Sequence, residues 1–479
     1  MIKNIINKCL GVACTAVIFT ACTIPALVDK SVNTKTPESF NNSLDQDTTN
    51  TANAHWKDYF SDPYLNALID TALSNNQELN ITLQEIQIAR NEVRAKKGEY
   101  LPSVGIGAAA GVDKVGRYTR NGAVESNLEI DEGKEFPEPL GDLMIGAYAN
   151  WEVDIWKKLR NAKKSAMMRY LSSVEGKNFM VTNLIAEIAN SYYELLALDN
   201  ELDNVQKNIQ ILNDALKIVK LQKDAARVTE LAVKRFEAEV LKNQSRQYYI
   251  KQEIVEVENE INFLVGRYPQ PVERDSESFI DLIPQSIQAG VPAQLLENRP
   301  DIRQAEMELA AAKLDVKVAK ARFYPSLGIS AGIGFQAFNP SYLAKTPESL
   351  LYSLAGDIMA PLVNRNAIKA DYMSANAAQI QAVYNYEQTV LNAYMDVVNK
   401  LSLIDNLNSS YELKAQQVEA LNQSITISTT LFRSARADYM EVLLTQREAL
   451  EAKFELIETK KLQLSAFVNM YQALGGGWH

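Results

Sequence analysis

Two long blocks of the sequence contain neither glycine nor proline, the residues that most often interrupt a helix. The first block runs from Lys177 to Val265 and the second from Leu362 to Leu474. A helix from about Arg160 to Ala225 would be roughly 100 Å long at 1.5 Å per residue. Apolar residues in the first block recur at steps of three and four, as in helices that pack as coiled coils, at Val181, Leu184, Ile188, Tyr192, Leu195, Leu198, Leu202, Val205, Ile209, Leu212, Leu216 and Val219. The sequence therefore predicts helical rods that are longer than a compact domain needs.

Each block has one plausible break, near Ala225–Glu230 in the first and near Arg433–Glu441 in the second. Asp438 and Glu441 have the spacing of an N-cap residue and its capping-box partner, which favours the start of a new helix there. Each block is predicted to fold back as an antiparallel helix pair, over residues 160–265 and 366–474. The two breaks should then share one end.

The chain also repeats itself. The stretch from Ser74 aligns with the stretch from Glu297, so that Asn75 pairs with Asn298 and Ala89 with Ala312. Each copy reads as a helix that stops at a proline and continues as a strand. The sequence thus predicts a first repeat over 56–268, an inter-repeat linker over 269–291 and a second repeat over 292–479.

Two hairpins are predicted after these prolines, over residues 103–156 and 326–363. In "LMIGAYANWEVDIW" and "SLLYSLAGDIMAPLV", as in "RFYPSLGISAGIGF", residues alternate with a period of two, which is typical of strands. One face is apolar and the other is small or polar. Glycines such as Gly105, Gly107, Gly328, Gly332 and Gly334 fit a tilted, curved strand in which larger side chains would crowd.

Four strands with one apolar face cannot close a membrane barrel alone, because open edges leave backbone groups unpaired in hydrocarbon. Bacterial barrels begin at eight strands. Several chains must therefore share one barrel, and three chains would give twelve strands. The predicted fold class is mainly α with a transmembrane β part, with four strands per chain and an internal two-fold repeat.

The first residues read as a bacterial lipoprotein signal. Lys3 and Lys8 precede a short apolar run that ends in "FTAC", which predicts a signal peptide over residues 1–21 and a lipid on Cys22. A plain signal peptide cut nearby is the alternative. Residues 22–55 are rich in Asn, Thr, Ser and Asp and are predicted to be a flexible, lipidated tether.

Composition excludes several classes of function. The three cysteines are Cys9, Cys14 and Cys22, and the two histidines are His55 and His479. We therefore expect no disulfide scaffold, no metal site, no His-dependent catalysis and no cofactor other than the covalent lipid. The net charge is −10 and no basic cluster stands out along the sequence, so nucleic acid is not an expected partner.

The sequence resembles the outer-membrane efflux factors, the TolC-like family, and within it the lipidated branch that serves resistance-nodulation-division pumps. The resemblance lies in "NRPDIRQAE", "FYPSLGIS", "WEVDIWKKLR", "ADYMEVLLTQRE" and the tail "YQALGGGW". It implies a homotrimeric channel in the outer membrane of a Gram-negative bacterium, with a 12-stranded barrel continuous with a 12-helix periplasmic barrel and an equatorial collar. Its implied role is the exit duct for drugs or metals in a tripartite pump, with a periplasmic adaptor and an inner-membrane transporter as partners.

The resemblance also implies functional residues. Channels of this family close at the periplasmic tips of the inner helix pair, so Met440, Glu441, Leu444 and Arg447 are candidates for the aperture; ordinary helix packing is the alternative. Contact with the adaptor is expected at the tips, at Arg227, Val228, Thr229, Arg436 and Asp438. The family favours glycine at both tip turns where Ala226 and Ala435 stand here, so wider turns are expected.

Three other readings remain open on the sequence alone. A type I protein secretion duct would share this architecture with different cargo. A surface-anchored coiled-coil lipoprotein would explain Cys22 and the heptads but leaves the four strands without a purpose. An enzyme is disfavoured, because "SLGISAGIG" lacks the G-x-S-x-G spacing and no helix follows it to receive a phosphate.

Overall fold

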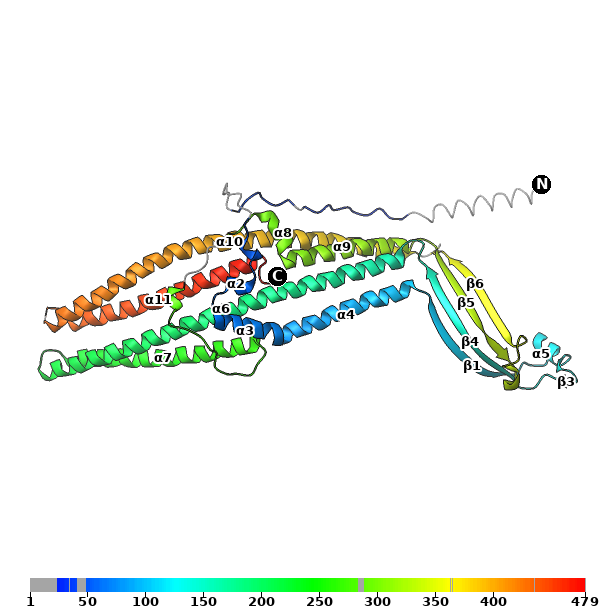
Figure 1. Ribbon diagram of the computed structural model, residues 1–479, viewed down its shortest axis with the longest axis horizontal. Helices are drawn as coiled ribbons and strands as arrows, with labels where there is room; N and C mark the ends of the chain where they lie inside the picture. The colour runs from blue at the N-terminus through cyan, green and yellow to red at the C-terminus, as the bar shows by residue number, and fades with distance from the viewer. Residues whose placement is uncertain are drawn as a thin grey trace. The chain divides into compact units, whose positions relative to one another are not determined.

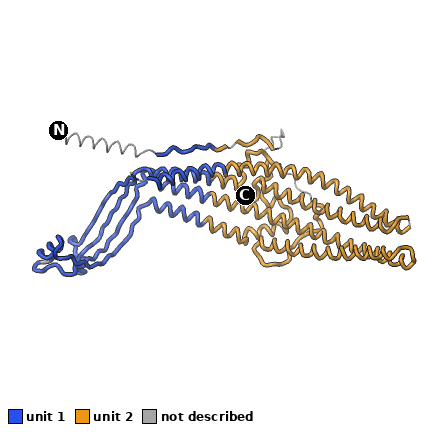
Figure 2. The backbone as a smooth tube through the Cα atoms, turned by 180° about the vertical axis from the view of Figure 1, so that it is seen from behind, with its two compact units in different colours: residues 1–31, 87–171, 307–384 blue, residues 32–86, 172–306, 385–479 orange. Residues whose placement is uncertain are grey.

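The computed structural model describes residues 24–33, 35–40, 49–282, 288–361, 363, 365–434 and 436–478. These form two compact units (Figure 2). Unit 1 contains residues 1–31, 87–171 and 307–384, and unit 2 contains residues 32–86, 172–306 and 385–479. The predicted lipid site, Cys22, lies outside the described residues.

Unit 1 is built on a four-stranded antiparallel sheet with the order β1-β4-β5-β6 (Figure 1). The strands are β1 (Ser103–Asp113), β4 (Leu140–Val153), β5 (Ser326–Ala337) and β6 (Leu350–Met359). Besides the two predicted hairpins, β4 of the first repeat pairs with β5 of the second over the register Leu143↔Ala337 to Val153↔Leu327. The sheet is therefore continuous across the repeats, and its outer edges belong to β1 and β6.

The loops at the far end of the sheet carry short elements. The β1–β4 loop contains α5 (Arg120–Glu125) and a small ribbon of β2 (Glu129–Asp131) and β3 (Lys134–Glu135). Glu138 in this loop pairs with Lys114 and Arg117. The β5–β6 loop contains the 3₁₀ turn η4 (Pro340–Tyr342).

Four helices leave the opposite end of the sheet and contribute residues to both units. They are α4 (Gln77–Tyr100), α6 (Lys158–Asp224), α9 (Pro300–Ala321) and α10 (Asn366–Arg433). α6 has 67 residues and α10 has 68. At 1.5 Å per residue each is about 100 Å long, as the glycine-free and proline-free blocks predict.

In unit 2, α6 and α10 fold back as α7 (Glu230–Leu264) and α11 (Tyr439–Ala473). Unit 2 also contains η1 (Thr51–Asn53), α2 (Trp56–Tyr59), α3 (Pro63–Asn75), η2 (Phe279–Asp281), η3 (Pro292–Gln294) and α8 (Leu295–Asn298). Its core packs α2 and α3 against α6, α7 and α11 around the fully buried Tyr192, Leu195 and Ile188. The rings of Tyr59 and Tyr471 stack there with centroids 4.1 Å apart.

The internal repeat is visible in the backbone. After α7, Gly266 has φ +72° and an added Cβ would lie 2.4 Å from the carbonyl oxygen of Asn75. After α11, Gly475 has φ +89° and an added Cβ would lie 2.5 Å from the carbonyl oxygen of Asn298. Asn75 and Asn298 are the residues that the sequence alignment of the two repeats pairs. Each repeat thus ends on a glycine because only a residue without a side chain fits against the opposing helix.

The segment before α2 differs from the expected flexible tether. Ile24 and Leu27 pack with Val316, Ala319 and Phe323 in an apolar cluster of unit 1. In unit 2, Phe40 is buried and its ring stacks on that of Tyr394. The few apolar residues in this polar segment are therefore enough to hold its described residues against the helices. The overall composition of the segment did not indicate these contacts.

Candidate functional site

The first candidate site is the apolar face of the sheet. The strand register aligns the predicted apolar positions of neighbouring strands, as in Ile106↔Ala147, Ala147↔Ile333 and Ile333↔Tyr352. Several of these side chains are strongly exposed in the single chain, among them Ile106 at 86% and Leu354 at 80%. A continuous exposed apolar face of this kind marks a surface that meets lipid or another chain.

The opposite face is small and polar, and its glycines make room for one aromatic ring. Tyr148 on β4 faces Gly105 on β1 and Gly332 on β5 in the register. A Cβ on Gly107 or Gly332 would lie 3.3 Å or 3.4 Å from the Tyr148 ring. The glycines therefore allow a large side chain to lie across the neighbouring strands of this face.

A buried carboxylate fixes the joint between β4 and α6. Asp154 accepts hydrogen bonds from the backbone N–H groups of Leu159 (3.0 Å) and Arg160 (2.9 Å), and from Nε of Arg160 (3.0 Å). Burial alone would raise the pKa of Asp154, but these donors outweigh it and the pKa is lowered. A charged cap thus sets the direction in which α6 leaves the sheet.

The second candidate site is the pair of helix tips. In the α6–α7 turn, Ala226 has φ +53°, its N–H donates to Lys223 O (2.8 Å) and that of Arg227 donates to Gln222 O (2.8 Å). This is the tight Schellman ending, with alanine in the left-handed position where glycine is usual. The expectation of a wider turn is therefore wrong at Ala226, and Ala435 lies outside the described residues.

The predicted adaptor contacts differ in accessibility. Arg227, Thr229, Arg436 and Asp438 are exposed. Val228 instead packs in an apolar cluster that joins the two tips, defined by Leu212, Val219, Ala232, Val233, Phe236, Val240 and Leu443 with Ala215, Leu216, Phe432 and Tyr439. Val228 is therefore better explained as part of tip packing, whereas the other four are free for a partner to reach.

The predicted capping box at the start of α11 is not formed. Asp438 occupies the N-cap position, but its side chain makes no capping hydrogen bond. The N–H of Glu441 donates instead to the backbone carbonyl of Asp438 (3.1 Å). The turn is closed by main-chain groups, which leaves the Asp438 carboxylate exposed.

The aperture candidates lie on the exposed side of α11. Glu441, Leu444 and Arg447 are exposed, whereas Val442, Leu443 and Gln446 between them are buried. Met440 is half-buried, and its sulfur accepts a hydrogen bond from Nη1 of Arg235 on α7 at 2.6 Å. The four candidates thus share one side of α11, and Met440 also links the two helix pairs.

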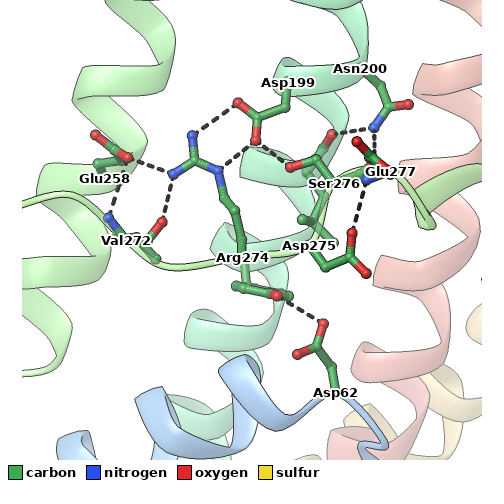
Figure 3. A network of polar contacts seen from close by, with 11 residues as sticks. Asp62, Asp199, Asn200, Glu258, Val272, Arg274, Asp275, Ser276 and Glu277 are labelled. Carbon is green, nitrogen blue, oxygen red and sulfur yellow. Dashed lines mark hydrogen bonds and ion pairs between the residues drawn. The ribbon is translucent and has the colours of Figure 1, made fainter.

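Sequence reasoning missed a polar clamp in the linker after α7 (Figure 3). Arg274 holds Asp199 of α6 through Nε (2.5 Å) and Nη2 (2.9 Å), and Glu258 of α7 through Nη1 (2.6 Å). Ser276 also donates to Asp199. The clamp fastens residues 272–276 to both helices of the first pair, and only the three-dimensional structure brings its members together.

Sequence reasoning also missed amide pairs between helices. Asn190 of α6 donates a hydrogen bond to Asn469 of α11 (3.0 Å), and Gln472 of α11 donates one to Asn183 of α6 (2.8 Å). Gln463 joins α11 to α10 through Asn408 at 2.8 Å. Such directional pairs inside apolar seams fix the register of long helices, which apolar contacts alone leave free to slide.

Glu201 on α6 provides a testable pH dependence. Burial raises the pKa of Glu201 to about 7. Four charged groups on α7 and α11 also act on this pKa: Arg246 and Lys461 lower it, and Glu458 and Glu253 raise it further. The folded state then holds a proton that the unfolded chain has lost, so the contribution of Glu201 to stability falls as pH rises from about 4.5 to about 7.

We expect Glu201→Gln to slow amide hydrogen exchange in the surrounding turns of α6, α7 and α11 at pH 8, and to match the wild type at pH 5. The neutral amide mimics the protonated acid at both pH values, so only the charged wild type loses protection. The exposed Glu256→Gln is the matched control. An equal effect of Glu201→Gln at both pH values would contradict this explanation.

Neither a metal centre nor a membrane-spanning helix is found in the described part of the chain. No group of three or more His, Cys, Asp or Glu side chains there could hold a metal ion. No helix among these residues combines the length and the apolar composition needed to cross a membrane.

Known proteins share this fold and sequence pattern. The profile of the outer membrane efflux protein family matches residues 68–267 and 291–476. The chain is 27% identical over 426 residues to the pyoverdine export outer membrane protein OpmQ of Pseudomonas aeruginosa, covering 88% of this chain and 87% of that one. It is 25% identical over 468 residues to the cation efflux system protein CusC of Escherichia coli, covering 97% and 98%.

A solved structure supports the same assignment of fold. The open state of the MtrE outer membrane channel of Neisseria gonorrhoeae superimposes with a TM-score of 0.83 at 21% identity, over 95% of this chain and 98% of that one. The chain belongs to the outer membrane efflux protein family. The prediction of an outer-membrane channel component of an efflux pump is therefore confirmed at the level of the family.

Proposed function

We propose that three copies of the chain form the passive exit duct of a tripartite efflux pump, with a shared 12-stranded barrel and a helical barrel that extends into the periplasm. The observation that carries this proposal is the sheet of unit 1. All four strands align their apolar positions on one face, and among the described residues the outer edges of β1 and β6 pair with no further strand.

Open strand edges favour an oligomer for an energetic reason. Each unpaired backbone group in hydrocarbon costs several kcal/mol, so an apolar sheet with two free edges is unstable in a bilayer. Pairing β1 of one copy with β6 of the next removes both edges. Four strands are too few for a closed barrel, so at least two copies are needed. We propose three copies, and therefore twelve strands, because the resemblance to the TolC-like family implies a trimer.

The remaining parts of the proposal follow from the tips and the N-terminus. The exposed Arg227, Thr229, Arg436 and Asp438 would contact a periplasmic adaptor, through which an inner-membrane resistance-nodulation-division transporter supplies the energy. A lipid on Cys22 would anchor the chain to the outer membrane. No cofactor and no catalysis are needed for a duct, and its cargo would be drugs, metal ions or other small toxic compounds.

A cysteine scan across the open edges tests the trimer. Ala108→Cys on β1 is combined in turn with Tyr352→Cys, Leu354→Cys, Gly356→Cys or Ile358→Cys on β6, all on the apolar face. In oxidised outer membranes, we expect one register to give a disulfide-linked ladder that ends at the trimer on a non-reducing gel.

The control combines Ala108→Cys with Ile333→Cys on β5, a strand that lies between β4 and β6 and so cannot reach another copy. This pair should give no ladder. Absence of a ladder for every β6 position, together with a native mass of one copy, would refute the shared barrel.

A further inference from the structure

We propose that the helical part of unit 1 carries a basic belt that binds the anionic headgroups of phospholipids in the adjacent leaflet of the outer membrane. The belt comprises residues 87–100, 154–171, 307–325 and the described residues of 360–384, the portions of unit 1 that adjoin the sheet. The inference rests on the proposed function, because it takes the apolar sheet face to lie in the bilayer.

The belt concentrates positive charge in an acidic protein. Its four segments contain sixteen lysines and arginines but only six aspartates and glutamates, whereas the whole chain has a net charge of −10. The segments are separated in the sequence by strands and by whole helix pairs, so no basic cluster stands out along the chain. Folding brings them together in one unit.

The belt lies at one end of the sheet. The register Ser103↔Asn150, Val153↔Leu327 and Ser326↔Met359 places all four junctions between strand and helix at the same end. Lys97 and Lys320 each precede a strand by six residues. Both lysines lie in the last turn of their helices, α4 and α9, and therefore close to the end of the sheet.

Many of the belt cations are available to a partner. Lys313, Lys317 and Lys320 form one exposed stripe on α9, and none of them is in an ion pair with another described residue. Exposed Lys97, Lys157 and Lys164 are equally unpaired within the described ranges. By contrast, Arg322 of the same belt is neutralised by Asp371 at 2.6 Å.

The N-terminal segment gives a second argument for the level of the bilayer, which uses the proposed lipid on Cys22. Ile24 and Leu27 pack in the cluster that contains Val316 and Ala319, which alternate along α9 with Lys317 and Lys320. Two residues of chain span at most about 7 Å. A lipid attached two residues before Ile24 would therefore enter the membrane beside this stripe of lysines.

Assembly of three copies would increase the electrostatic repulsion among the basic residues of the belts. Three copies in one ring would place three belts at the same height, and their like charges would repel. Anionic headgroups at that height relieve the repulsion, and each nearby lysine or arginine contributes about 1 kcal/mol to binding an anionic lipid surface.

The test compares two full-length variants that lose the same charge. Lys313→Gln, Lys317→Gln and Lys320→Gln are combined in the belt variant. The control variant combines Lys207→Gln, Lys217→Gln and Lys220→Gln. These exposed lysines lie toward the C-terminal end of α6, outside the belt. Native mass spectrometry from micelles that contain equal phosphatidylglycerol and phosphatidylcholine gives both the mass of the particle and the ratio of bound lipids.

We expect the wild type and the control to prefer phosphatidylglycerol, and the belt variant to lose at least about fivefold of this preference, since each removed lysine contributes about 1 kcal/mol. Higher salt should weaken the preference in all three proteins. Equal lipid ratios in wild type and belt variant, with the trimer intact, would overturn the belt and leave the proposed duct standing. A particle of one copy would instead overturn the proposed function.

Discussion

Replacement of Arg274 by alanine is expected to release the linker after α7 from the helices that it joins. The Arg274 side chain is only 15% exposed, and its removal leaves the largely buried carboxylates of Asp199 and Glu258 without their cation. Removal of one partner from a buried ion pair costs about 3–5 kcal/mol. Amide hydrogen exchange over residues 266–282 should accelerate at least about a hundredfold, because 1.4 kcal/mol is a factor of ten.

Two further variants separate the loss of charge from the loss of geometry. Arg274→Lys keeps the charge but cannot hold Asp199 through two parallel hydrogen bonds, so we expect intermediate protection. Arg274→Met combined with Asp199→Asn and Glu258→Gln removes every charge of the clamp. This variant should exchange more slowly than Arg274→Ala, because no carboxylate remains buried without a partner. Wild-type exchange in Arg274→Ala would show that the clamp does not hold the linker.

The helix pairs could be predicted because their signal is local. A long absence of glycine and proline, with apolar steps of three and four, specifies a helix without knowledge of its partners. The predicted start near Arg160 and break near Ala225 agree with α6 at Lys158–Asp224. The second break, near Arg433–Glu441, agrees with α10 ending at Arg433 and α11 beginning at Tyr439.

The polar details could not be predicted because their partners are distant in the sequence. Arg274 meets Asp199, 75 residues earlier, and Gln472 meets Asn183, 289 residues earlier. The spacing of Asp438 and Glu441 allows a capping box, but the choice between side-chain and main-chain acceptors depends on the turn itself. Sequence spacing thus defines which local bonds are possible, and packing decides which of them form.

The strands show the same division between local and distant information. Period-two alternation predicts which residues share a face, and the observed register agrees for β4, β5 and β6. The pairing of β4 with β5, which joins the two repeats into one sheet, has no local sequence signal. The basic belt is invisible for the same reason, because its charges are spread over four segments.

Leu444→Ser is expected to raise the single-channel conductance of the protein in a planar bilayer severalfold if the exposed side of α11 lines the periplasmic aperture. Leu444 is 44% exposed in the single chain, and three copies would bring three such side chains toward one axis. Apolar constrictions close channels by excluding water, so a small polar side chain both widens and wets the opening. The double variant with Met440→Ser should conduct more, because it also removes the contact with Arg235.

The chain offers a closely matched control in Leu462. It lies on the same helix, eighteen residues or five full turns beyond Leu444, and is 43% exposed. Leu462→Ser therefore makes the same chemical change on the same side of α11, about 27 Å farther from the tip than Leu444. Its conductance should equal that of the wild type. A rise of equal size in both variants, or none in Leu444→Ser, would move the constriction away from Met440, Glu441, Leu444 and Arg447, and would leave ordinary helix packing as the explanation for their placement.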